Sequence, residues 1–162
     1  MIYDNERIRR RDRLLQEAEA THLLKNGEYG VLSMQAEETG AYGIPVSYVW
    51  DGRSAIYIHC APEGRKLRCL ERCDRVSFCV VGTTRVLPDK FTTEYESIVL
   101  SCRAFLGPDE RERRHALSLL LDKYSPLDKE TGLGYAEKSF HRTRIIRLDI
   151  ESWSGKAKRS AR

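Results

Sequence analysis

Ile56-Tyr57-Ile58-His59-Cys60-Ala61-Pro62-Glu63-Gly64-Arg65-Lys66-Leu67 is the stretch on which the interpretation of this chain depends. Residues 55–60 have the composition of a β-strand, and the turn residues after them lead into a short helix that carries Leu67. A glycine followed by two cations at a helix start combines free backbone N–H groups, the positive end of the helix dipole and side chains that pair with a phosphate. The stretch is therefore a candidate phosphate site. Taken alone, Gly-Arg-Lys before a helix more often marks a solvated face, and it is neither a Walker loop nor a Rossmann fingerprint.

Alternating strands surround this stretch on both sides. Asp51-Gly52 predicts a tight hairpin turn before the strand at 55–60, because glycine tolerates the positive φ of such turns. The run at 95–106 has the longest alternation of apolar residues with others. In all, the pattern predicts about six strands, at 29–34, 43–50, 55–60, 76–81, 95–106 and 144–150, with a turn at 37–40 and a loop over 82–88.

Helices are expected at three places. Residues 7–25 have apolar side chains at helical spacing, and Gly27 follows as a stop. The short helix begins near Arg65, and a longer one begins at Pro108-Asp109-Glu110 and is stopped by Ser125-Pro126. A glycine-containing mobile loop is expected from there to residue 137. Few helices and many hairpin-linked strands favour a mainly β fold, a small six-stranded antiparallel barrel with flanking helices in one domain over 1–162.

Bulk composition favours a soluble protein. Of the 162 residues, 41% are hydrophobic and 32% are charged, and no apolar run approaches the roughly 20 residues that span a bilayer. The first residues are rich in arginine and lack the apolar stretch of a secretory signal, so we expect a cytoplasmic protein without a membrane partner. Five cysteines, an odd number, are expected to be reduced thiols. Cys69 and Cys73 have a spacing that could hold a metal, but no second pair accompanies them, and no metal is expected.

The positive charge is concentrated at the two ends. The chain has a formal net charge of +4, but nine of its 28 basic residues lie within 7–13 and the tail at 156–162. Residues 14–155 hold 19 basic and 21 acidic residues, so the body is not a basic surface. Nucleic-acid binding through the tails remains the weakest alternative. Neither a nucleophile elbow nor a pair of catalytic carboxylates is apparent, which leaves hydrolase chemistry without a starting point.

Several motifs in a shared order resemble one known family. Gly43-Ile44-Pro45-Val46-Ser47-Tyr48, then Asp51-Gly52, then His59 to Lys66 resemble the central signature of Nim-type nitroimidazole resistance proteins, within the pyridoxamine phosphate oxidase-like superfamily of FMN-binding split barrels. Further matches cover nearly the whole chain and lie at 9–13, 95–99, 121–124 and 147–156. The resemblance implies a six-stranded split barrel that binds FMN in a cleft at the interface of a homodimer.

The resemblance also implies roles for individual residues. Arg65 and Lys66 would neutralise the FMN phosphate, with close backbone approach at Ala61 and Gly64. The strand Pro45-Val46-Ser47-Tyr48 would line the flavin ring, although Val46 and Tyr48 equally suit the core. The other candidates for cofactor contact are His59, Cys60, Glu96, Ser97 and Trp153.

His59 is the one candidate catalytic residue. It stands at a strand end beside the proposed phosphate site, and an imidazole pKa near neutrality suits proton transfer or substrate binding. A structural histidine is an equally good interpretation.

The implied activity is that of an FMN-dependent oxidoreductase. A reduced nicotinamide or another donor would reduce the flavin, which would then reduce a nitroimidazole or a related small acceptor. The alternative is a flavin-binding or haem-binding split barrel without turnover, because a fold does not fix a function.

Overall fold

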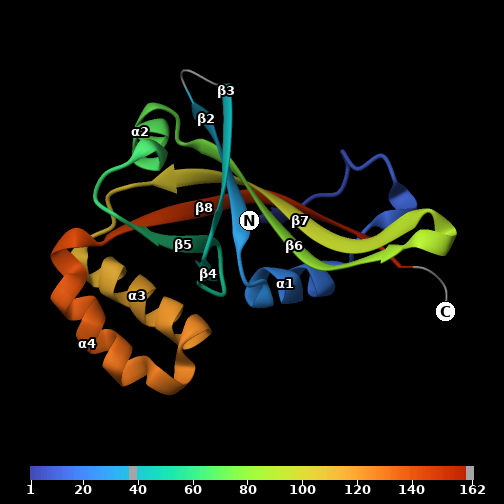
Figure 1. Ribbon diagram of the computed structural model, residues 1–162. Helices are drawn as coiled ribbons and strands as arrows, with labels where there is room; N and C mark the ends of the chain where they lie inside the picture. Colours follow the sequence, from blue (N-terminus) through green and yellow to red (C-terminus); the bar gives the residue numbers. More distant parts are fainter. Residues whose placement is uncertain (37–39, 160–162) are drawn as a thin grey trace.

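The computed structural model describes residues 1–36 and 40–159 and shows one large, mainly antiparallel sheet with helices beside it (Figure 1). The strands are β1 (Ile2–Tyr3), β2 (Gly30–Ala36), β3 (Gly40–Val46), β4 (Val49–Trp50), β5 (Ala55–Cys60), β6 (Arg75–Leu87), β7 (Thr92–Phe105) and β8 (Arg144–Lys158). The α-helices are α1 (Glu17–Asn26), α2 (Arg65–Arg72), α3 (Glu110–Tyr124) and α4 (Lys129–Ser139). The expected turn at 37–40 lies outside the described residues except for Gly40.

The sheet is curled although it is not closed. Its strand order is β3-β2-β6-β7-β8-β5-β4, and β1 adds in parallel to β8. The strands at the two ends of this order, β3 and β4, are separated in the chain by Ser47 and Tyr48 alone. Two residues can join opposite ends of a sheet only if the sheet bends round toward itself. The expected single strand at 43–50 is therefore wrong, because it is two strands at opposite edges.

Three strands are longer than the sequence pattern predicts. β6 continues through the expected loop at 82–88, with a register irregularity between Val81 and Thr84. β8 includes the residues expected to form the start of the basic tail, since Lys156 and Lys158 pair with Ser97 and Tyr95 of β7. These extensions build a long ribbon of β6, β7 and β8 that leaves the core on the side away from α2 (Figure 1).

The helices differ from expectation at two places. The helix expected over 7–25 begins only at Glu17, because Gln16 and Glu19 form a capping box that fixes the start of α1. Ahead of that cap, Arg11–Arg13 form a short 3-10 helix, and the Leu15 N–H donates to Gly155 O of β8. The mobile loop expected before residue 137 contains α4, which packs close to α3 at Gly132. A Cβ at Gly132 would lie 2.5 Å from Leu121 Cδ2, so a larger residue there would force the Leu121 side chain to move.

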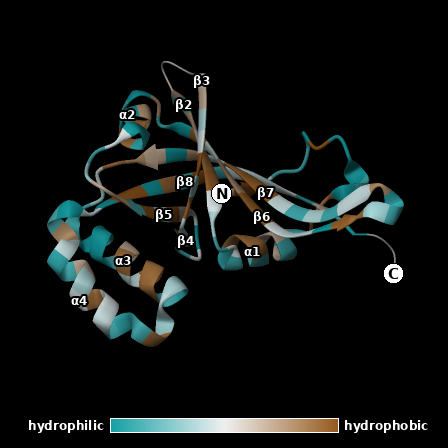
Figure 2. Ribbon diagram, viewed as in Figure 1, coloured by the Kyte–Doolittle hydropathy of each residue, from teal (hydrophilic) through white to brown (hydrophobic). Residues whose placement is uncertain are grey.

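Apolar side chains fill the inside of the curled sheet, as the hydropathy colouring shows along its central strands (Figure 2). Tyr48 and Phe78 are both fully buried and meet edge to face with ring centroids 5.0 Å apart. A second, smaller cluster under α3 holds that helix on β4, β5 and β8; it consists of Val49, Tyr57, Ala116, Leu120 and Ile145. The filled interior leaves the outer wall of the sheet as the place for a ligand.

No helix among the described residues is long and apolar enough to cross a membrane.

Candidate cofactor site

The start of α2 is open to a ligand. Gly64 precedes the helix at φ +142°, a conformation that L side chains rarely adopt, and nothing lies within 4 Å of where a Cβ would be. The N-cap side chain makes no hydrogen bond to the helix, so the first backbone N–H groups of α2 lack a capping side-chain acceptor. The arrangement suits an anion, because the helix dipole places partial positive charge at the same point.

The two cations of the stretch have different surroundings. The Arg65 guanidinium lies over the Tyr42 ring of β3, 4.1 Å from its centroid, and so ties the start of α2 to that strand. Lys66 is half-buried, and its positive charge acts on the neighbouring end of β5. The structure thus places His59 and Cys60 close enough to Lys66 to feel its charge, with Arg65 next to it at the same helix start.

His59 and Cys60 show the effect of that environment. Partial burial of the imidazole lowers the pKa of His59, and the charge of Lys66 lowers it further. Burial raises the pKa of the Cys60 thiol, while Lys66 and Arg144 act in the opposite direction. His59 is therefore neutral at pH 7 in the protein without a ligand, and the site as a whole is positive.

We expect Lys66→Ala to raise the pKa of His59, because the substitution removes a positive charge that disfavours the imidazolium. An NMR titration of the imidazole protons measures this directly in flavin-free protein, and Arg68→Ala, two residues further along α2, is the control. An unchanged His59 pKa in Lys66→Ala would show that the two side chains do not interact.

The flavin strand proposed from the sequence divides between surface and core. Pro45 and Ser47 are exposed on the outer face of the sheet, and Val46 is half-buried against the core. Tyr48 is 0% exposed and its hydroxyl donates to Leu24 O at 2.7 Å, so its side chain belongs to the core. The Tyr48 side chain was offered as a lining of the flavin ring or as part of the core, and in the structure it lies in the core.

Glu96, Ser97 and Trp153 lie on the part of β7 and β8 away from α2 (Figure 1). Glu96 accepts a 3.5 Å contact from Arg159, and Ser97 borders a small cavity beside Arg7 and Lys156. Trp153 is 2% exposed and contacts Tyr3 edge to face at 4.8 Å. Within one chain, the structure does not bring these three residues to the start of α2.

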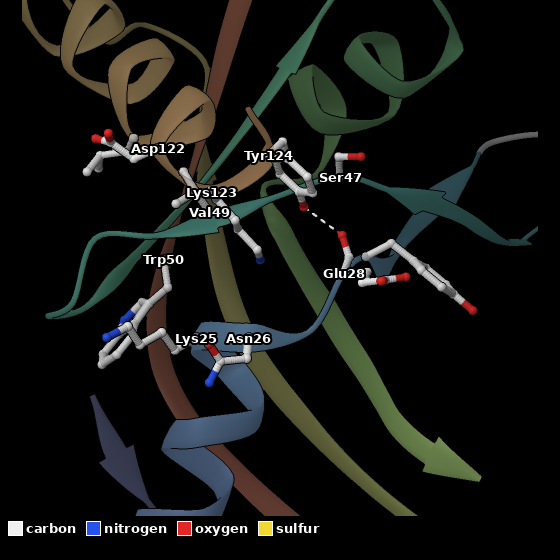
Figure 3. A pocket seen from close by; sticks show the side chains of 11 residues that line it. Lys25, Asn26, Glu28, Ser47, Val49, Trp50, Asp122, Lys123 and Tyr124 are labelled. Atoms are coloured by element: carbon white, nitrogen blue, oxygen red, sulfur yellow. Dashed lines mark hydrogen bonds between the residues drawn. The ribbon is translucent and has the colours of Figure 1, made fainter. Parts of the chain in front are cut away.

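Sequence analysis missed a cavity of about 800 Å³ between the end of α1, β4 and the end of α3 (Figure 3). Ser47 borders it, and Lys123 and Tyr124 come from α3. The Lys123 amine donates to Tyr48 O at 2.9 Å, and the Tyr124 hydroxyl donates to Glu28 O at 2.6 Å. The helical spacing places Leu121 and Tyr124 on the apolar side of α3, but it does not show that the last turn of this helix faces the bend at Ser47.

The curled, unclosed sheet and its flanking helices define a protein of the split β-barrel class. The model of the pyridoxamine 5'-phosphate oxidase family matches residues 16–157. The chain belongs to this family, and the superfamily resemblance found in the sequence is confirmed. None of the curated proteins matches the sequence.

Solved structures confirm the split-barrel fold. One from Bacteroides thetaiotaomicron, provisionally assigned to 5-nitroimidazole antibiotic resistance, has a TM-score of 0.71 and 15% identity over 90% of this chain and 86% of its own. A FAD-binding protein from Mesorhizobium loti has a TM-score of 0.65 and 23% identity over 91% of this chain and 98% of its own. The FAD- and haem-binding protein from Mycobacterium smegmatis has a TM-score of 0.69 and 16% identity over 91% of this chain and 74% of its own.

Proposed function

We propose that this protein is an FMN-dependent oxidoreductase that reduces a nitroimidazole or a related small acceptor. The observation that carries the proposal is the uncapped start of α2, where Gly64, Arg65 and Lys66 combine open space, free N–H groups and two cations. These residues fit a terminal phosphate, and FMN carries one. The family membership and the flavin-binding structural relatives add support.

The chain's own residues would hold and orient the cofactor. Arg65 and Lys66 would pair with the phosphate, and Pro45 of β3 with Ser47, the residue after this strand, would present backbone groups along the ring edge. When bound, the flavin supplies the acceptance and transfer of hydride or electrons. His59 is neutral beside the phosphate site, so it can accept a proton or a hydrogen bond there.

The absorbance spectrum of the purified protein tests the cofactor. Flavin bands with a released compound that is FMN rather than FAD support the proposal, and oxidation of a reduced nicotinamide on addition of a nitroaromatic supports turnover. A Soret band would favour the alternative, a haem-binding protein without turnover. We consider this alternative because one structural relative binds FAD and haem. The absence of both flavin and Soret bands after reconstitution with FMN would contradict both the oxidoreductase and the binding protein.

We further propose that the protein works as a homodimer with the flavin between the subunits. The barrel interior is filled, so the ring must lie on the outer wall, where one chain covers only one of its faces. Ser97 and Glu96 lie away from α2 in their own chain, and a two-fold partner can bring the equivalent residues to the site.

Flavin and dimer stability should then be linked, because a ligand that binds only the assembled form stabilises it by mass action. Light scattering at low micromolar concentration is expected to give a dimer for the FMN-loaded protein. A monomer that retains stoichiometric FMN would contradict the shared site.

A further inference from the structure

The cavity of about 800 Å³ between α1 and α3 contains an unusual lysine (Figure 3). Lys123 extends from the last turn of α3 toward the end of α1. Its amine donates to Tyr48 O at 2.9 Å and lies 3.7 Å from the centroid of the Tyr48 ring. These two contacts leave at least one N–H of the ammonium group for a third partner.

No carboxylate within residues 1–36 and 40–159 forms an ion pair with Lys123. The neighbouring acid on the same helix, Asp122, pairs instead with Lys129 at 2.6 Å. Lys25, on the opposite side of the cavity, likewise has no ion pair in the described ranges. Two cations thus border the cavity without an ion pair in the described ranges, beside two carboxylates, Glu28 and the already paired Asp122, and an anion inside the cavity would give Lys123 a partner.

The walls of the cavity are apolar and aromatic. Trp50 and Val49 of β4 form one side, and Leu119 and Tyr124 of α3 form another. Flat walls with two cations at the edges suit a planar ring that carries one negative group. The volume of about 800 Å³ is in the range of small-molecule sites.

We propose that this cavity binds a small aromatic carboxylate, with the carboxylate paired to Lys123 and the ring against Trp50. The site stands on this chain's geometry alone. A role for it as the acceptor pocket rests on the proposed function, because Ser47 borders the cavity and also belongs to the proposed flavin strand.

Isothermal titration calorimetry of the full-length protein with benzoate and with benzamide tests the site. Benzamide has the same ring without the charge, so benzoate should bind at least about tenfold more tightly at pH 7. Lys123→Met should reduce benzoate affinity to that of benzamide. Lys138→Met, on the exposed side of α4, is the matched control and should bind as the wild type does. Equal affinity of the wild type for the two compounds, or a benzoate affinity of Lys123→Met equal to that of the wild type, would overturn the proposal.

A second variant separates loss of the site from loss of folding. Leu119→Trp keeps Lys123 but fills the cavity, so it should abolish benzoate binding while its circular dichroism and thermal midpoint stay near those of the wild type. Retained benzoate binding in this folded variant would place the ligand elsewhere and overturn the proposal.

The pH dependence gives a readout that a purely structural lysine would not produce. Burial lowers the pKa of Lys123 to about 8, and the groups facing it are Tyr48, Tyr124, Lys25 and Glu28, with Asp122 on its own helix. Benzoate binding should weaken as pH rises past about 8, where the amine loses its charge, and Lys123→Met should lack this step.

Added FMN distinguishes this site from the cofactor site. Benzoate binding that persists at saturating FMN supports a separate cavity, whereas competition between the two would show that the cavity is part of the flavin site. If FMN does not bind at all but benzoate does, the proposed function fails and this inference stands.

Discussion

Replacing both Arg65 and Lys66 with alanine is expected to weaken FMN binding about a hundredfold or more. Each cation paired with a phosphate contributes roughly 1.5–3 kcal/mol, and every 1.4 kcal/mol is about tenfold in affinity. The two side chains are neighbours, so their effects need not add. Quenching of flavin fluorescence during titration measures the affinity of the double and single variants.

The fold of the double variant should survive, because Arg65 is exposed and Lys66 only half-buried. Arg65→Ala alone also removes the contact with the Tyr42 ring, so Arg65→Lys helps to separate charge from stacking. Arg68→Ala, an exposed cation one turn further along α2, should bind FMN as the wild type does. Wild-type affinity in the double variant would remove the phosphate site from the proposal.

The start of α2 could be predicted from sequence because every part of it is local. Gly64, Arg65 and Lys66 are consecutive, and the positive φ, the missing cap and the two charges all follow from residue types at fixed offsets. His59 and Cys60 are only a few residues away on the strand that leads into the helix. Short-range chemistry therefore allows the open helix start and its charges to be predicted, and the phosphate that they would bind stays a prediction.

The bend at Ser47-Tyr48 could not be predicted in the same way. Residues 43–50 alternate as one strand should, and no glycine or proline follows Val46 to interrupt it. The interruption comes from distant groups, since Tyr48 N–H donates to the Tyr124 hydroxyl and Lys123 donates to Tyr48 O. Both partners lie some 75 residues away in the sequence, so the same contacts that break the strand also form the wall of the cavity.

α4 was missed for a related reason. Residues 129–139 have few apolar positions and contain Gly132 and Gly134, which lower helix propensity. In the structure Gly132 allows close packing on Leu121, so tertiary contact compensates for weak local preference.

Tyr48→Ala is expected to lower the free energy of unfolding by about 3–5 kcal/mol, because it removes a fully buried aromatic ring from the centre of the core. The ring contacts Phe78, and its hydroxyl satisfies Leu24 O at the end of α1, so the loss leaves both a cavity and an unpaired carbonyl. Tyr48→Phe keeps the ring and removes the hydroxyl alone, and should lower the free energy of unfolding by about 1 kcal/mol. Urea denaturation measures both variants.

Comparison of stability with flavin affinity then separates the two roles suggested for Tyr48. If its side chain acts only in the core, Tyr48→Phe should bind FMN within about twofold of the wild type although it is less stable, since twofold is well under 1 kcal/mol. Tyr135→Ala is the control for removing a tyrosine, because this side chain is 69% exposed on α4 and its loss should change stability by less than about 0.5 kcal/mol. A Tyr48→Phe protein of wild-type stability but much weaker FMN affinity would instead place the hydroxyl at the cofactor.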